Sequence, residues 1–324
     1  MHCKAFCLAA GLTLVAMLTP AWAQSQAYPQ KPVKVVVAFT AGGTTDILAR
    51  TVAQQLSDRL KQPFVIDNKP GAGGNLGTEL VVRSAPDGYT LIVNSVGPIA
   101  VNPTLYGKLP YNPLTDLVPI VQIADVPNVL VIHPSVPANT LEELVAYAKA
   151  HPGKLNYGST GIGTSSHLSS FMLSKRVGFE ATHIPYKGAD ALKDLLAGRI
   201  QFMFATIPSV MTHITAGKLK PIAVSSLKRS RSMPDVPTVV GKGFPQFEAG
   251  SWFGFFAPKG TPEAVITLVN KTVNEILQVP AIEQHMVAQG ADPAGGTPAQ
   301  FGQFVQREHD KWRAIVRDSG AKAE

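Results

Sequence analysis

Apolar residues after residue 30 follow two alternating periods along the chain. Residues 33–39 (VKVVVAF) are mostly apolar and β-branched, as in a strand whose two faces are both buried. Leu48, Val52 and Leu56 then recur on one face of a helix. The elements predicted in this part are, in order, strand 33–39, helix 45–60, strand 64–67, helix 76–84 and strand 90–94. This alternation predicts a parallel sheet with helices packed against it.

The same alternation returns after residue 127. Thr140 and Glu143 have the spacing of a capping box, which fixes the start of one helix. Thr261-Pro262 and Thr297-Pro298 each place a proline after a capping residue, and they predict helices that end near residues 277 and 316. The other predicted elements are strand 128–133, helix 140–149, strand 155–158, helix 164–176, strand 181–185, helix 190–197, and strands 201–205, 219–225 and 252–257.

Two connections rich in proline and glycine, 97–116 and 228–244, separate these blocks. We therefore predict an α/β protein with two lobes, each a mainly parallel sheet flanked by helices. Lobe 1 takes residues 24–123 and 225–324 and lobe 2 takes residues 124–224, so the chain crosses twice between them. A cleft between two lobes is the usual place for a small ligand.

The composition agrees with two globular lobes. The 324 residues exceed the roughly 250–300 that one hydrophobic core serves, and 45% hydrophobic with 16% charged residues excludes a disordered chain. The formal net charge is +7, but the basic residues are scattered and their densest group is 228–231 (KRSR). A diffuse basic surplus argues against nucleic acid as a partner.

The first 23 residues have the pattern of a secretory signal peptide. Lys4 precedes an apolar run over 6–18, Pro20 follows, and Ala21-Trp22-Ala23 fits the small-residue cleavage motif. The apolar run is too short to span a membrane. We expect cleavage after Ala23, a periplasmic location and a soluble, monomeric mature protein.

Both cysteines, Cys3 and Cys7, lie in this segment. Cleavage would leave a chain without a disulfide, a thiolate nucleophile or a cysteine ligand for metal. The histidines after residue 23 show no H-E-x-x-H spacing. We therefore expect neither a metal nor an organic cofactor.

A first candidate ligand loop joins strand 33–39 to the next helix. A glycine pair and several hydroxyl residues at a helix N-terminus expose N–H donors and a positive dipole end, which suits an anion. A tight structural turn is the alternative. The candidate ligand residues here are Phe39, Thr40, Ala41, Gly42, Gly43, Thr44 and Thr45.

A second candidate loop, 158–167 (GSTGIGTSSH), also leads from a strand into a helix. Two such loops, one from each lobe, could close on one ligand from opposite sides. The candidates here are Ser159, Thr160, Gly161, Gly163, Thr164, Ser165 and His167, and three residues at other strand ends join them: Asn94, Ser95 and Thr206.

The charges near these loops refine the ligand class. Neither 40–45 nor 158–167 contains lysine or arginine, so an anion there would be held by hydroxyl and backbone donors, helix dipoles and water. That favours a carboxylate over a nucleotide polyphosphate. His167 can serve either as a ligand donor or as a cap or core hydrogen-bonding group. Asp46 and Arg50 have the spacing of a local ion pair.

Enzyme motifs are incomplete. The segment 71–76 (GAGGNL) lacks the third glycine of a dinucleotide fingerprint, and no phosphate-binding P-loop motif occurs. No G-x-S-x-G elbow occurs, and Ser165 or Ser166 beside His167 would point in different directions on a helix. We expect no catalytic residue; a secreted α/β hydrolase is the alternative.

Six motifs occur in the order seen in a known family: 39–46 (FTAGGTTD), 68–75 (NKPGAGGN), 86–91 (PDGYTL), 158–164 (GSTGIGT), 185–188 (PYKG) and 257–262 (APKGTP). In these motifs the chain resembles the periplasmic solute-binding proteins of the tripartite tricarboxylate transporter family, the Bordetella uptake gene group. The resemblance covers the whole chain after the signal peptide.

This resemblance implies a periplasmic-binding-protein (Venus-flytrap) fold that captures a small organic acid between its lobes: a mono- or dicarboxylate, an aromatic carboxylate or an acidic amino acid. It implies that the first loop holds a carboxylate through bridging waters, and that a two-component membrane permease receives the ligand. A sensor kinase is the alternative recipient. Ala38 and Thr40 replace prolines usual in the family, and 189–194 (ADALKD) is one residue short. The ligand's identity therefore stays open.

Overall fold

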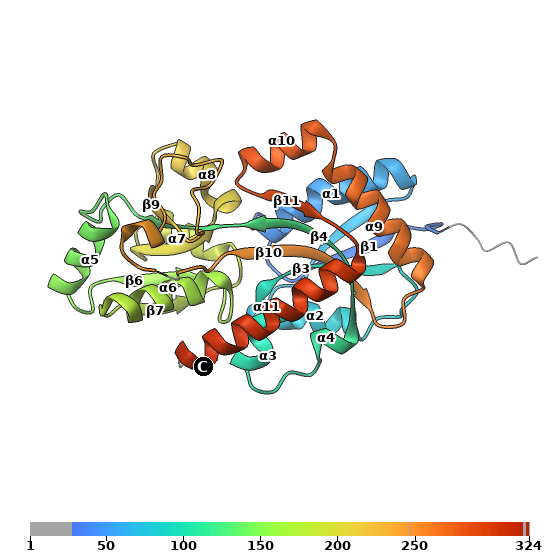
Figure 1. Ribbon diagram of the computed structural model, residues 1–324, viewed down its shortest axis with the longest axis horizontal. Coiled ribbons are helices and arrows are strands. Elements are labelled where there is room, and N and C mark those ends of the chain that lie inside the picture. Colours follow the sequence, from blue (N-terminus) through green and yellow to red (C-terminus); the bar gives the residue numbers. More distant parts are fainter. Residues whose placement is uncertain (1–27, 246, 320–321, 324) are drawn as a thin grey trace, which may run out of the picture.

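A computed structural model describes residues 28–245, 247–319 and 322–323. The predicted signal peptide lies outside the described residues. The chain forms two lobes, each built on one sheet (Figure 1). Among the described residues, none of the helices combines the length and the apolar character needed to cross a membrane.

The sheet of lobe 1 has six strands in the order β11-β4-β10-β3-β1-β2. Its strands are β1 (Val33–Val37), β2 (Phe64–Asn68), β3 (Thr90–Ser95), β4 (Leu117–Val126), β10 (Ser251–Pro258) and β11 (Asp292–Gly295). Alternate residues of β1 enter two different hydrophobic clusters, Val35 on one face and Val36 on the other. Both faces of β1 are therefore buried, which explains its continuous apolar sequence.

Helices cover both faces of this sheet. The helices α1 (Thr44–Leu60) and α9 (Glu263–Leu277) pack on one face, and α2 (Asn75–Val82) and α11 (Pro298–Ser319) pack on the other. The remaining helices of lobe 1 are α10 (Pro280–Ala288) and the short segments η1 (Ala72–Gly74), η2 (Gly97–Val101), α3 (Asn102–Leu105) and α4 (Pro113–Asp116).

The sheet of lobe 2 has five strands in the order β7-β6-β8-β5-β9. The strands are β5 (Asn128–Ile132), β6 (Asn156–Ser159), β7 (Thr182–Pro185), β8 (Phe202–Thr206) and β9 (Lys220–Val224). The helices are α5 (Leu141–Ala150), α6 (Ser165–Val177), α7 (Asp190–Leu196) and α8 (Ile207–Thr215), with η3 (Val240–Lys242) in the returning segment. Thr140 caps α5 by accepting a hydrogen bond from the Glu143 amide at 3.1 Å, so the predicted helix start is confirmed.

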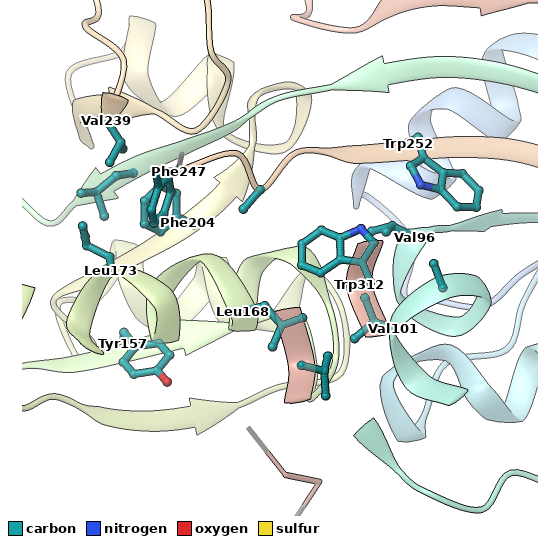
Figure 2. Packing of buried hydrophobic residues seen from close by; sticks show 14 of the residues in the cluster. Val96, Val101, Tyr157, Leu168, Leu173, Phe204, Val239, Phe247, Trp252 and Trp312 are labelled. Carbon is teal, nitrogen blue, oxygen red and sulfur yellow. The ribbon is translucent and has the colours of Figure 1, made fainter. Parts of the chain in front are cut away.

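The chain crosses between the lobes along β4 and β10, which pair antiparallel from Leu117↔Pro258 to Val126↔Ser251 (Figure 1). The first predicted crossing, near residue 123, falls inside β4. The second, predicted near residue 224, is made by β10 instead, because residues 225–249 stay with lobe 2: the Ser225 amide donates to the Asn128 carbonyl at 2.8 Å and the Ala249 amide donates to the Ser225 carbonyl at 3.4 Å. Beside these strands, Trp252 and Trp312 of lobe 1 and Phe204 and Phe247 belong to one hydrophobic cluster that reaches into both lobes (Figure 2).

The predicted two-lobed α/β class is confirmed, but the sheets are mixed and not mainly parallel. β1 pairs in parallel with β2 and β3, and β6 pairs in parallel with β7 and β8. The strands that begin or end a crossing run antiparallel to their neighbours because the chain must enter and leave each lobe at the same end.

Candidate functional site

A cavity of about 420 Å³, counting its open mouth, lies between the two lobes. Lobe 1 contributes residues from the β1–α1 loop and from the ends of β3 and β10, and lobe 2 contributes residues from the β6–α6, β7–α7 and β8–α8 junctions. The lining residues are Phe39, Gly43, Thr44, Thr45, Ser95, Thr160, Thr164, Ser165, Gly188, Ala189, Thr206, Ser251 and Phe253.

Hydrogen bonds join the lobes at the edge of this cavity. The hydroxyls of Thr44 and Thr206 lie 2.5 Å apart, one from each lobe. Thr40 donates to the Lys187 carbonyl at 2.9 Å and accepts from the Ala189 amide at 2.8 Å. The lobes are therefore closed on each other. Thr40 holds them together through hydrogen bonds at the edge of the cavity, and Thr44 lines the cavity itself.

The polarity of the cavity comes from helix N-termini and hydroxyl groups. Thr44 begins α1, Thr164 caps α6 and Thr206 is the N-cap residue of α8, so three helices from two lobes direct their N-terminal ends toward one space. Each such end carries a partial positive charge and amide donors. No lysine, arginine, histidine, aspartate or glutamate is among the described residues that line the cavity.

Four lining hydroxyls have no hydrogen-bond partner for their side-chain oxygen among the described residues: Thr45, Ser95, Thr160 and Ser251. Three of them are at most 6% exposed, so they are withdrawn from bulk solvent. None of these oxygens is a fully buried atom without a partner, so each keeps some accessible surface. An acceptor-rich ligand would complete their hydrogen bonding.

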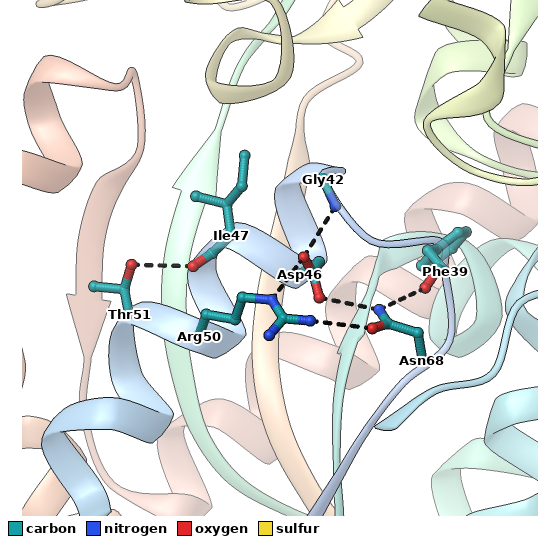
Figure 3. A network of polar contacts seen from close by, with 7 residues as sticks. All are labelled: Phe39, Gly42, Asp46, Ile47, Arg50, Thr51 and Asn68. Carbon is teal, nitrogen blue, oxygen red and sulfur yellow. Dashed lines mark hydrogen bonds and ion pairs between the residues drawn. The ribbon is translucent and has the colours of Figure 1, made fainter. Parts of the chain in front are cut away.

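A polar network fixes the shape of the β1–α1 loop (Figure 3). Asp46 accepts hydrogen bonds from the Gly42 amide at 2.9 Å, from Arg50 at 2.9 Å and from Asn68 at 3.0 Å, and Asn68 also donates to the Phe39 carbonyl at 3.0 Å. Burial alone would raise the pKa of Asp46, but these donors together hold it below its ordinary value. The predicted Asp46–Arg50 ion pair is confirmed. This ion pair keeps the Asp46 carboxylate charged, and the Arg50 guanidinium balances that charge.

Several predicted ligand residues lie behind the cavity wall and do not line it. Ser159 is buried and lies 2.7 Å from Nε2 of His183. Asn94 is buried and donates to Thr78 at 2.8 Å. His167 accepts from the Gly163 amide at 3.3 Å. The predicted residues outside the lining set are Thr40, Ala41, Gly42, Asn94, Ser159, Gly161, Gly163 and His167.

Three glycines where the lobes meet explain why some of the predicted residues do not line the cavity. A Cβ on Gly163 would lie 1.9 Å from Oδ1 of Asn102, and a Cβ on Gly73 would lie 2.2 Å from the Ile162 carbonyl. Gly161 also approaches Gly73, because a Cβ on Gly161 would lie 3.3 Å from Cα of Gly73. These glycines let the two backbones touch, so their role here is close approach between lobes.

Four lining residues were not predicted: Gly188, Ala189, Ser251 and Phe253. Ala189 begins the segment 189–194, which is one residue shorter than usual in the family, and Gly188 directly precedes it. Ser251 and Phe253 lie on β10, which comes from far along the chain and pairs with β3 at Phe253↔Ser95. The only feature of the sequence that could have pointed to Ser251 and Phe253 is that their strand follows a predicted crossing between lobes.

Burial keeps the His167 imidazole neutral: it lowers the pKa of His167 to about 3, with a further contribution from His183, whose own pKa falls to about 4. Unfolded histidines take up a proton near pH 6.5, whereas His167 in the folded chain does not. The stability that this residue contributes is therefore complete above pH 6.5 and is lost as pH falls toward 3.

We expect urea unfolding to show about 2 kcal/mol less stability from this residue at pH 4.5 than at pH 6.5. His167→Gln should remove that part of the decline. The exposed His151→Gln is the matched control and should keep the wild-type pH dependence. An unchanged pH dependence in His167→Gln would contradict the assignment.

The fold and the site together define a class. Two α/β lobes joined by two crossing strands and closed over a neutral, donor-rich cavity form a solute-binding protein of the periplasmic type. Sequence comparison then identifies the family: residues 48–321 match the tripartite tricarboxylate transporter family receptor, and the chain belongs to this family. Its members are solute receptors, not enzymes, so the predicted absence of catalytic chemistry agrees with the family.

Relatives support this assignment. Protein BugT of Bordetella pertussis is 41% identical over 297 residues, which cover 91% of this chain and 91% of BugT. The structure of R. palustris Rpa4515 with adipate has a TM-score of 0.89 at 37% identity and covers 91% of this chain and 99% of that one. MatC from Rhodopseudomonas palustris with bound malate has a TM-score of 0.85 at 33% identity and covers 89% and 100%.

Proposed function

We propose that this chain is a receptor that captures a small organic acid in the interlobe cavity for uptake by a tripartite tricarboxylate-type transporter. The observation that carries the proposal is the set of four unpartnered hydroxyls, Thr45, Ser95, Thr160 and Ser251, in a cavity without charged side chains. Such donors match a carboxylate, whose two oxygens accept several hydrogen bonds. The ligands in the Rpa4515 and MatC structures, adipate and malate, support a dicarboxylate.

The proposed binding set is narrower than the predicted one. We assign ligand contact to the lining residues, with α1 and β3 serving one carboxylate and the β6–α6 loop serving the other end of the ligand. Thr40 is proposed to hold the lobes together and His167 to support the β6–α6 loop, because neither lines the cavity.

We also propose that the chain is exported and cleaved after Ala23, and that it acts in the periplasm as a monomer. Native mass spectrometry of the periplasmic fraction checks both points. A mass that includes residues 1–23, or a dimer, would contradict them.

A thermal-shift screen of dicarboxylates with four to six carbons tests the function. At a concentration near 100 times Kd, linkage raises the unfolding free energy by about 2.7 kcal/mol, which is a shift of several degrees. The matched control is 1,6-hexanediol, which keeps the carbon chain of adipate and lacks both carboxylates. The proposal fails if polyols or amines stabilise the protein and no carboxylate does.

A further inference from the structure

A second cavity lies in lobe 2, and the β6–α6 loop separates it from the interlobe cavity. Thr160 and Thr164 of this loop line the interlobe cavity, whereas Ile162 lines the second one. The second cavity has about 1210 Å³ of empty space, counting its mouth. It is not part of the site proposed above.

Aromatic rings form much of its wall. Tyr157 stacks on His183 with ring centroids 4.9 Å apart, and His183 stacks on His167 at 4.2 Å. Phe171 and Phe179 also line the cavity. Stacked and tilted rings around an open space favour a planar apolar guest.

One wall offers a hydrogen-bond donor. Nδ1 of His167 accepts from the Gly163 amide, so the neutral ring carries its proton on Nε2. In the described part of the chain Nε2 has no hydrogen-bond partner, although His167 is only 5% exposed. Nε2 is not fully buried either, and the residue that carries it lines the second cavity.

Lys175 places a positive charge at the other end of the second cavity. His167, Phe171 and Lys175 follow one another at i, i+4 and i+8 on α6, so a donor, a ring and a cation lie along one helix face over roughly 12 Å. Nζ of Lys175 lies over the Phe171 ring, 5.7 Å from its centroid, so the positive charge is close to the ring. Lys322 adds a second cation to the lining and Glu180 adds one anion.

We propose that this cavity is a second binding site, specific for a small hydroxylated aromatic acid. The ring of the ligand lies among Phe171, Phe179 and the stacked imidazoles. Its hydroxyl oxygen accepts from Nε2 of His167, and its carboxylate pairs with Lys175 at the rim. The para arrangement of the two groups fits the order of donor, ring and cation along α6.

Calorimetry with 4-hydroxybenzoate tests this site on the full mature chain. We expect one equivalent to bind this lobe with a Kd below 1 mM in order of magnitude. Benzoate lacks the acceptor and 4-hydroxybenzyl alcohol lacks the carboxylate, so each should bind about three- to tenfold more weakly. No binding of 4-hydroxybenzoate at 10 mM, on the order of ten times that limit, would overturn the proposal.

Two variants locate the bound probe. Lys175→Gln should weaken binding about three- to tenfold, since this exposed charge is partly screened. Ser174→Phe fills the cavity from α6 and should weaken binding at least about thirtyfold. Lys149→Gln, an exposed lysine on α5, is the matched control and should bind as the wild type does.

Urea unfolding of each variant separates lost affinity from lost folding. If Lys175→Gln and Ser174→Phe fold and retain wild-type affinity, 4-hydroxybenzoate binds elsewhere and the proposal is overturned. The dicarboxylate screen is read independently, so failure of either site leaves the result for the other intact.

Discussion

Gly97→Leu should weaken ligand binding at least about a hundredfold and leave both lobes folded. Gly97 begins η2 in lobe 1, but the three atoms nearest to a Cβ built on it all belong to lobe 2: the Gly163 carbonyl oxygen at 3.3 Å, Cα of Thr164 at 3.6 Å and the Gly163 carbonyl carbon at 3.8 Å. A leucine side chain at this position therefore starts against lobe 2 and should block closure. Binding then loses the donors of one lobe, a difference of about 2.7 kcal/mol or more.

Calorimetry with the dicarboxylate found by the screen measures this effect, and small-angle scattering should show no ligand-induced compaction in the variant. Gly97→Ala adds only the Cβ, which is tight against Gly163, and should cost a few-fold. The control is Ala146→Leu, which places the same side chain on the exposed side of α5. Wild-type affinity in Gly97→Leu would show that closure does not bring these two loops together.

Thr45→Val should weaken dicarboxylate binding about tenfold to a hundredfold without lowering stability. Valine keeps the shape and removes only the hydroxyl, and a hydrogen bond to a charged acceptor contributes roughly 1.5–3 kcal/mol. The Thr45 hydroxyl bonds to no described residue, and Gly43 is the N-cap of α1, so no helix cap is lost. Ser95→Ala should act in the same direction for the same reason.

Thr164→Val is a less clear test, because Thr164 donates to the Gly161 carbonyl at 2.8 Å and caps α6. Affinity and urea unfolding should be measured on the same Thr45 and Ser95 variants. Thr182→Val, an exposed threonine on β7, is the matched control and should bind as the wild type does. Full affinity in both test variants would place the ligand away from these hydroxyls.

The lining residues that the sequence predicted are those that follow a strand and open a helix. Thr44, Thr45, Thr164, Ser165 and Thr206 all lie at such junctions, where side chains and helix N-termini are exposed together. Each of these positions is determined by a strand and a helix that are neighbours in the sequence. They could therefore be predicted without knowing how the lobes meet.

Positions set by long-range pairing could not be predicted in this way. β4 was missed because Pro119, Gln122 and Asp125 interrupt its apolar run, and its pairing with β10 shifts register beside Pro119. β11 (DPAG) has almost no strand propensity and exists as an edge strand against β4. The helices α8 and α10 were also not predicted.

The role of His167 depended on a partner that spacing does not reveal. His183 is sixteen positions away on β7, and its ring stacks on His167 inside the lobe. Inside the lobe, Nδ1 of His167 accepts from the Gly163 amide at 3.3 Å.

The position of β10 in the lobe 1 sheet has a consequence for how the protein is made. β10 is hydrogen-bonded between β4 and β3, so without it β4 and β11 are separate from β3, β1 and β2. All five strands of lobe 2 have been synthesised once the ribosome passes Val224, whereas β10 begins only at Ser251. A nascent chain that stops between these points can complete the lobe 2 sheet, holds lobe 1 as two unjoined halves and has no cleft.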